Sequence, residues 1–84
     1  MVKRKRLDPE TSALAARIGR RVRALRHDRG LTQTILAERA GLTRIYIGEF
    51  ERGVRANPTL ANLRHIADGL GVPVQDLFPR DDGR

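Results

Sequence analysis

The sequence predicts an all-α fold of five helices in a single small domain. Apolar residues recur at the three- and four-residue spacing of a helix face, and no stretch alternates long enough to indicate a strand. Threonine or aspartate precedes several apolar stretches and glycine follows several of them, as at helix starts and ends. A chain of 84 residues allows one domain with a modest core. We therefore expect a domain over residues 9–79, with a basic arm at residues 1–8 and a short tail at residues 80–84.

The first helix is expected from Pro9 to about Arg29. Asp8 can accept a hydrogen bond from a free amide of the opening turn, and Pro9 suits the first helical position. Gly30 is the natural residue to follow the end of such a helix. The apolar stripe that should face the core consists of Leu14, Ile18, Val22 and Leu25.

The middle of the chain predicts two short helices, at about 32–40 and 43–52, joined by a tight turn at Gly41. Each begins with a threonine that can cap it, and Gly48 is expected to let the two helices approach closely. Two short helices with a glycine turn form the helix-turn-helix pattern, whose second helix can enter the major groove of DNA. The apolar positions of the pair are Leu31, Ile35, Leu36, Ala37, Ala40, Leu42, Ile47 and Phe50.

A fourth helix is expected after Thr59, which can cap it, and a fifth over Val74–Phe78, between two prolines. Gly69 and Gly71 are expected to weaken the end of the fourth helix. The apolar face of the fourth helix consists of Leu60, Leu63, Ile66, Ala67 and Leu70.

The net charge of +7 is concentrated at one end of the chain. Residues 1–30 contain ten Lys or Arg against three Asp or Glu, whereas residues 31–84 contain seven of each kind. A clustered basic excess favours a polyanionic partner, most often nucleic acid. The arm at residues 1–8 could lie along phosphates or enter a minor groove, or have no specific role. A solvated basic face is expected of Arg20, Arg21 and Arg23, with a distant attraction for phosphates as the alternative.

The composition argues against an enzyme, a metal site and a membrane protein. The chain has no cysteine, which excludes disulfides, Cys nucleophiles and Cys-based metal sites. His27 and His65 lie on different predicted helices without acidic partners at ligand spacing. No apolar run is long enough to cross a membrane, and the basic N-terminus lacks the apolar segment of a secretory signal. We expect a cytoplasmic binding protein that needs no cofactor.

Five motifs follow one another in the order and spacing of a known family. They are RxLRxxRGLTQ at 23–33, LAERAGLT at 36–43, YIGEFERG at 46–53, NPTLxxL at 57–63 and IADGLGVPVQDLF at 66–78. Together they resemble the Cro/phage-repressor type of helix-turn-helix domain, the XRE-like group of bacterial and phage regulators. The resemblance covers most of the chain and implies a compact five-helix, lambda-repressor-like domain. It also implies a transcriptional regulator that binds a palindromic operator in double-stranded DNA as a homodimer.

Three residues of the predicted recognition helix are candidates for base contacts. Arg44 can make a bidentate contact with guanine, with a phosphate contact as the alternative. Ile45 can meet a thymine methyl group, or can pack at the edge of its helix. Glu49 can pair with a neighbouring arginine or accept from a cytosine amino group, or can lie in solvent at the rim.

Phosphate contacts are expected from residues that flank the groove. In the resembled family the residue at Gln33 typically contacts the DNA backbone and sometimes bridges to a residue of the recognition helix. An amide at a helix N-terminus suits the backbone contact. Tyr46 could instead pack against the preceding helix. The loop that holds Arg55 has one residue more than the commonest form of the family, which leaves the direction of Arg55 open. The full expected set is Gln33, Thr43, Tyr46, Arg52 and Arg55.

The resemblance gives Arg26 and Glu51 a structural role, as a largely buried ion pair between the first and third helices. Removing one partner of such a pair leaves an uncompensated charge in the interior.

An apolar cluster near the C-terminus predicts a two-fold homodimer, because a small monomer would struggle to bury all of it. The cluster consists of Val72, Val74, Leu77 and Phe78. The alternative is that Leu77 and Phe78 only close the monomer core. The alternative function is an antitoxin or adaptor module that binds a partner protein, such as a toxin or a polymerase, with DNA binding secondary.

Overall fold

Four α-helices and a short 3-10 helix form the part of the chain that the computed structural model describes, residues 8–54 and 58–80. In chain order they are α1 (Pro9–Asp28), α2 (Gln33–Ala40), α3 (Arg44–Arg52), α4 (Leu60–Leu70) and the 3-10 helix η1 (Val74–Leu77). No strand occurs in these residues, so the predicted all-α class is confirmed.

The fifth element is a single 3-10 turn rather than the α-helix expected over Val74–Phe78. The Asp76 amide donates to the Pro73 carbonyl at 2.9 Å, three residues back along the chain. The prolines at positions 73 and 79 leave five residues between them. Because an α-helix needs a succession of bonds four residues apart, this interval is too short for one.

Threonine caps and left-handed glycines set the ends of α2, α3 and α4. The hydroxyls of Thr32, Thr43 and Thr59 each accept a hydrogen bond at 3.0 Å from the amide three residues later. The same helices end at glycines with φ between 71° and 77°, where a side chain would be strained. At the start of α1 the Asp8 carboxylate accepts from the Thr11 amide at 2.7 Å. The predicted starts of the four α-helices, and the predicted ends of the first three, are confirmed to within one residue.

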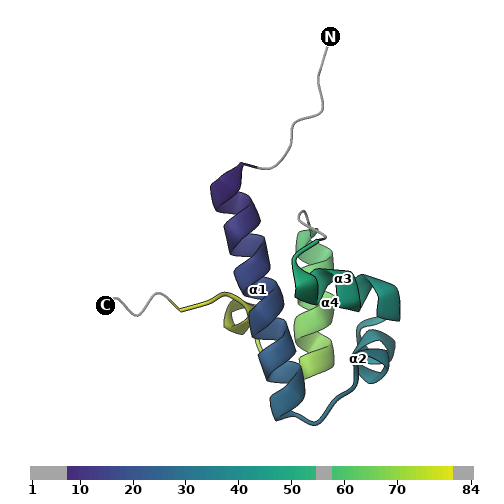
Figure 1. Ribbon diagram of the computed structural model, residues 1–84. Helices are drawn as coiled ribbons and strands as arrows, with labels where there is room; N and C mark the ends of the chain where they lie inside the picture. Colours follow the sequence, from purple (N-terminus) through teal and green to yellow (C-terminus); the bar gives the residue numbers. More distant parts are fainter. Residues whose placement is uncertain (1–7, 55–57, 81–84) are drawn as a thin grey trace.

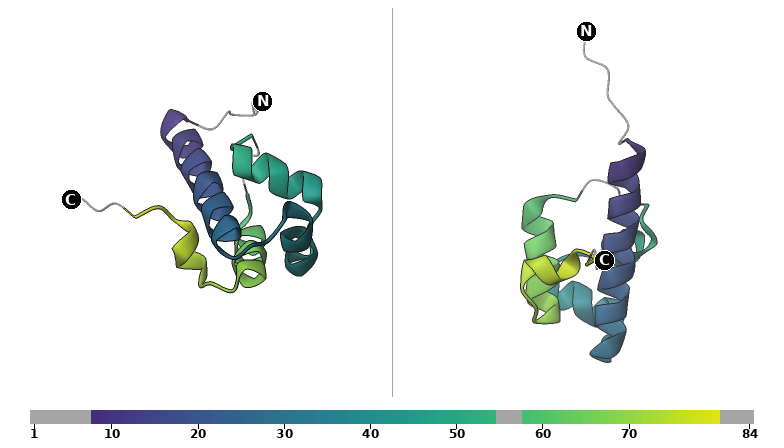
Figure 2. Two further views of the ribbon diagram at one scale, coloured as in Figure 1. Left: turned by 60° about the horizontal axis from the view of Figure 1, so that its bottom comes forward. Right: turned by 90° about the vertical axis from the view of Figure 1, so that its left-hand side faces the viewer.

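The helices are arranged so that α2 and α3 lie together on one side of the molecule (Figure 1). α1 packs against α3, and α2 packs against both α3 and α4. The chain then passes from the end of α4 to the side of α1 (Figure 2). There Arg21 Nε donates to the Asp76 carbonyl at 2.9 Å, which attaches η1 to α1.

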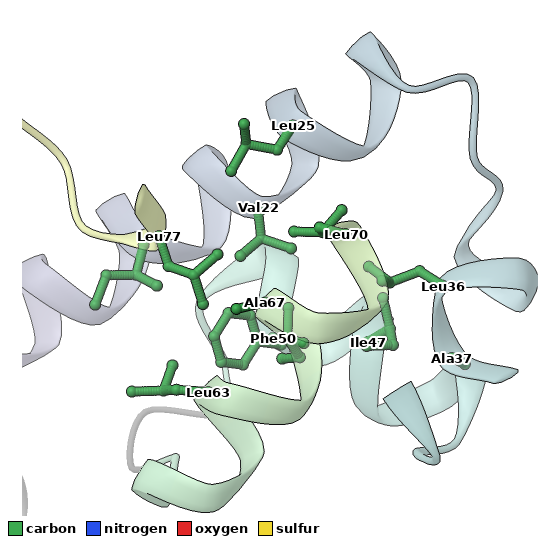
Figure 3. Packing of buried hydrophobic residues seen from close by; sticks show 12 residues of the cluster. Val22, Leu25, Leu36, Ala37, Ile47, Phe50, Leu63, Ala67, Leu70 and Leu77 are labelled. Atoms are coloured by element: carbon green, nitrogen blue, oxygen red, sulfur yellow. The ribbon is translucent and has the colours of Figure 1, made fainter. Parts of the chain in front are cut away.

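The hydrophobic core lies where the four α-helices and η1 meet (Figure 3). Each of these elements contributes one of the largest fully buried side chains, which are Val22, Leu36, Ile47, Ile66 and Leu77. Leu77 therefore belongs to the core of the single chain and has no surface left for a second copy. This corrects the place of Leu77 in the expected dimer interface.

Three residues expected on the core-facing side of their helices lie at the surface. They are Leu14, Ile35 and Leu60, with exposed fractions of 39%, 38% and 75%. Leu14 lies in the opening turns of α1, which project past the neighbouring helices in Figure 1. Helical spacing identifies the apolar face of a helix, but it does not reveal how far along that helix a packing partner extends.

Two glycines allow helices to approach closely. A Cβ at Gly19 would lie 2.3 Å from the backbone oxygen of Phe50, so α1 and α3 meet at this point. A Cβ at Gly69 would lie 3.0 Å from the Leu36 Cδ1 atom, so Gly69 brings α4 close to α2 inside a helix that continues through it. At Gly48 a Cβ would meet only the ends of flexible side chains. The close approach of α2 and α3 that was expected at Gly48 is therefore not found there. The tight positions are Gly19, between α1 and α3, and Gly69, between α4 and α2.

Candidate nucleic-acid interface

The first turn of α3 presents two large side chains to solvent. Thr43 caps this turn, and the next two residues, Arg44 and Ile45, are both exposed. Ile45 has an exposed fraction of 63%, so packing at the edge of its helix accounts for only a minor part of its surface. The Arg44 side chain donates no hydrogen bond within residues 8–54 and 58–80. Glu49 lies one turn beyond Ile45 and is half-buried, at the margin of the same face.

The opposite side of α3 is fixed to the domain. Ile47, Gly48, Phe50 and Glu51 are buried. Because one side of α3 is held by the core and the other is exposed, α3 can present Arg44 and Ile45 from a rigid support.

Tyr46 has a role inside the domain that the sequence left open. Its ring lies 6.1 Å from the ring of Phe50, and its hydroxyl accepts a hydrogen bond from Asn62 Nδ2 at 3.2 Å. Asn62 belongs to α4, so this hydrogen bond joins Tyr46 to α4. The phosphate contact expected of Tyr46 stays a prediction.

Beneath the α2–α3 pair lies the ion pair expected between Arg26 and Glu51, which is confirmed. Arg26 Nε and Nη2 donate to the two carboxylate oxygens of Glu51 at 2.7 and 2.9 Å, and Nη1 donates to the Leu31 carbonyl at 2.9 Å. Both residues are buried, with exposed fractions of 7% and 6%. The hydrogen bonds to Glu51 raise the pKa of Arg26 above its ordinary value, although burial acts in the opposite direction.

Gln33 joins this ion pair from the start of α2. Its Nε2 atom donates to Glu51 Oε1 at 3.1 Å. The Glu51 carboxylate thus ties together α1, α2 and α3, and it fixes the position of the Gln33 amide. The resemblance placed Gln33 at a phosphate, with an occasional bridge to a residue of the recognition helix, and the bond to Glu51 of α3 is such a bridge.

A pocket of about 240 Å³ opens beside these residues. It is lined by Arg23, Arg26, Gln33, Glu51 and Arg52, which come from three different helices. The structure thus brings two of the expected phosphate-contact residues, Gln33 and Arg52, to one place. It adds Arg23, which the sequence left on a solvated face, although its position one turn before Arg26 was a usable signal.

The remaining predicted site residues lie elsewhere. Val72 and Val74 are partly buried against the core, and Phe78 has an exposed fraction of 39%. Arg21 is half-buried and bonded to η1, so it does not lie on the expected solvated face. Arg55 lies outside the described residues.

The helices that the structure describes include none with both the length and the apolar character needed to cross a membrane. Within the same residues, no group of three or more His, Cys, Asp or Glu side chains is placed to hold a metal ion.

Comparisons of this chain with known sequences and structures all point to one family. A family model described as "Helix-turn-helix domain" matches residues 17–79. The immunity repressor protein of Bacillus phage phi105 is 46% identical over 60 residues, which cover 71% of this chain and 41% of the repressor. The HTH-type transcriptional regulator SinR of Bacillus licheniformis is 32% identical over 65 residues, which cover 77% of this chain and 59% of that protein. The chain thus spans about two fifths to three fifths of the length of these two relatives.

Solved structures agree with the sequence matches. The restriction-modification controller protein C.AhdI from Aeromonas hydrophila has a TM-score of 0.75 at 39% identity, with 79% of this chain and 98% of that chain covered. SinR, the master regulator for biofilm formation, in complex with DNA has a TM-score of 0.68 at 33% identity, with 71% and 95% covered.

The all-α fold, the α2–α3 pair and the buried Arg–Glu ion pair beneath it define a helix-turn-helix domain. With the matching family model and relatives, this chain belongs to the Cro/phage-repressor type of that family, the XRE-like group.

Proposed function

We propose that this domain binds a specific sequence in double-stranded DNA and is the DNA-binding part of a transcriptional regulator. The observation that carries the proposal is the first turn of α3, where Arg44 and Ile45 are exposed on a helix held from behind by the core. In helix-turn-helix proteins the N-terminal residues of the second helix come closest to the base edges. The proposal is for binding without catalysis, and it places the protein in the cytoplasm, where the DNA of bacteria and phages lies.

Specificity is assigned to three side chains of α3. Arg44 has the donors for a bidentate contact with guanine, worth roughly 1–3 kcal/mol of discrimination. Ile45 offers an apolar surface for a thymine methyl group, and Glu49 at the margin can accept from a cytosine amino group or orient a neighbouring arginine. Backbone contacts are assigned to Gln33, Thr43, Tyr46, Arg52 and Arg55, which fix the register of the helix on the duplex.

A homodimer is part of the proposal. Val72, Val74 and Phe78 leave apolar surface around η1, and a two-fold axis there would bring two copies of this surface together. The two recognition helices would then lie roughly 34–36 Å apart, one turn of the duplex. Sedimentation at micromolar concentration that gives only 9.4 kDa species would contradict the dimer.

Selection of bound sequences from random DNA tests the specificity and its symmetry. We expect a motif with two inverted halves. Arg44→Ala should abolish the preference at one base pair of each half, whereas Arg17→Ala, the same charge change at an exposed position of α1, should keep the motif. Identical motifs from both variants would contradict the role of Arg44.

A salt titration separates this proposal from its alternative, an antitoxin or adaptor that binds a protein such as a toxin or a polymerase. DNA binding through several phosphates should weaken with salt at a slope of about −0.9 per contact. Absent or salt-insensitive DNA binding would favour the alternative.

A further inference from the structure

The pocket between α1, α2 and α3 carries a more specific inference. We propose that Arg23 and Arg52 form a two-arginine clamp that binds one backbone phosphate of the DNA, with the Gln33 amide between them. This inference rests on the proposed function and extends it to Arg23, which lies on α1, outside the helix-turn-helix pair.

The charges of the pocket are unbalanced. Of its lining residues, Arg26 and Glu51 neutralise each other through two hydrogen bonds. Arg23 and Arg52 are exposed, and neither guanidinium group donates a hydrogen bond within the described parts of the chain. Two guanidinium groups thus line a concave site with no carboxylate left to pair with them, and such a site attracts an anion.

The neutral donor in the pocket is already oriented. Gln33 Nε2 carries two hydrogens, and one of them goes to Glu51 Oε1 at 3.1 Å. This bond holds the amide in place, so that the second hydrogen can be donated to a ligand without first ordering the side chain. Glu51 is thus a positioning residue for Gln33.

Gly48 marks the point where two of the donors converge. The position that a Cβ would take at Gly48 lies 3.4 Å from Arg52 Nη1 and 3.8 Å from Gln33 Nε2. The ends of these two side chains therefore lie over the same glycine of α3. Arg23 lines the same pocket from α1, so donors reach it from three helices.

A phosphate diester group matches this arrangement better than a carboxylate. A guanidinium group can donate two hydrogen bonds to the oxygens of one phosphate. Two guanidinium groups and one amide can therefore donate to the charged oxygens of a phosphate diester from several directions. The pocket also lies at the first residue of α2, where the positive end of the helix dipole favours an anion.

The test pairs protein variants with single neutralised phosphates. The probe is a short duplex that carries the selected binding site, in which one backbone phosphate at a time is replaced by an uncharged methylphosphonate. Arg23→Gln and Arg52→Gln are compared with Arg17→Gln, the same change at an exposed residue of α1 that does not line the pocket. Thermal unfolding of each variant confirms that it is folded.

In the wild-type protein, a methylphosphonate at one position of each half-site should weaken binding. This loss should be smaller in Arg23→Gln and in Arg52→Gln, because each variant keeps only one arginine at that phosphate. Because the two arginines share one phosphate in each half-site, the double variant Arg23→Gln/Arg52→Gln should lower the magnitude of the salt slope of the dimer by about 1.8, so that the loss of affinity between 50 and 200 mM salt is about 12-fold smaller. Each single variant should lower the slope by a smaller amount. Arg17→Gln should leave the slope and the methylphosphonate pattern unchanged.

If Arg23→Gln behaves as Arg17→Gln does, while the wild-type protein still binds DNA with a steep salt dependence, the clamp is refuted and the proposed function stands. If the wild-type protein binds no duplex, the proposed function fails and the clamp fails with it.

Discussion

Gly19 is the position where α1 and α3 come closest, and Gly19→Ala tests whether this contact determines the stability of the domain. The added Cβ would lie 2.3 Å from the carbonyl oxygen of Phe50 and 3.0 Å from that of Glu51. Both atoms are backbone atoms, so no rotation of a side chain can relieve the overlap. The two helices would have to move apart, and the core between them would open.

The magnitude follows from two opposing effects. Alanine favours a helix over glycine by about 1 kcal/mol, so the change would stabilise α1 if space allowed. Overpacking costs typically ~1–3 kcal/mol and occasionally more, and an overlap of about 1 Å with a backbone atom belongs at the upper end. We expect a net loss of about 2–3 kcal/mol, which lowers the midpoint of thermal unfolding by roughly 10–20 °C in a domain of this size.

Far-ultraviolet circular dichroism during heating measures the effect, with Gly48→Ala as the matched control. A Cβ at Gly48 would contact only flexible side-chain ends at 3.4 Å or more, so this variant should be as stable as the wild type or slightly more stable. Gly69→Ala, at 3.0 Å from Leu36 Cδ1, should fall between the two. A Gly19→Ala protein that melts with or above the wild type would refute this account of the α1–α3 contact.

Four further substitutions probe other parts of the structure. Arg26→Ala leaves the Glu51 carboxylate buried and unpaired, so urea unfolding should show a loss of ~3–5 kcal/mol; a neutral result would contradict the ion-pair assignment. Leu77→Ala opens a cavity in the core and should cost ~2–5 kcal/mol, whereas Phe78→Ala, at an exposed residue, should mainly weaken self-association in sedimentation. The Thr11 amide lowers the pKa of Asp8 in the folded state, so the Asp8 cap stabilises α1 above the ordinary pKa of about 3.9 and is lost as the pH falls through the folded-state value. Asp8→Asn should keep the cap but remove its dependence on pH. NMR signals from the first turn of α1 should therefore shift during an acid titration of the wild-type protein and stay constant in the variant. Wild-type signals that follow the same course as those of the variant would contradict the cap.

The helix boundaries were predictable because their causes are local. Thr32, Thr43 and Thr59 each accept from an amide three residues away, and the glycines that end the same helices relieve strain at a single residue. Such interactions are decided within one turn of chain, so the sequence alone contains them. The Arg26–Glu51 pair was expected only because the motifs around it resemble those of a known family.

Features that depend on how helices cross were not predictable in this way. Nothing near Gly19 in the sequence shows that a carbonyl of α3 will lie against it. Arg21 and Arg23 look alike in the sequence, yet one bonds to η1 and the other lines the pocket. Tyr46 could be assigned to Asn62 only once α4 was placed beside α3. These outcomes are set by distances between elements, which periodicity does not report.

Different residues of α3 anchor the helix and face the solvent, and this division determines which substitutions the domain can accept. Ile47, Phe50 and Glu51 anchor the helix, while Arg44 and Ile45 contribute little to the interior. Substitutions at exposed positions typically alter stability by no more than ~0.5 kcal/mol. Nearly any pair of side chains at positions 44 and 45 should therefore be tolerated by the scaffold, so a library randomised there would yield mostly folded proteins. The exposed side chains of this turn can therefore be replaced one substitution at a time, and each intermediate variant should still fold.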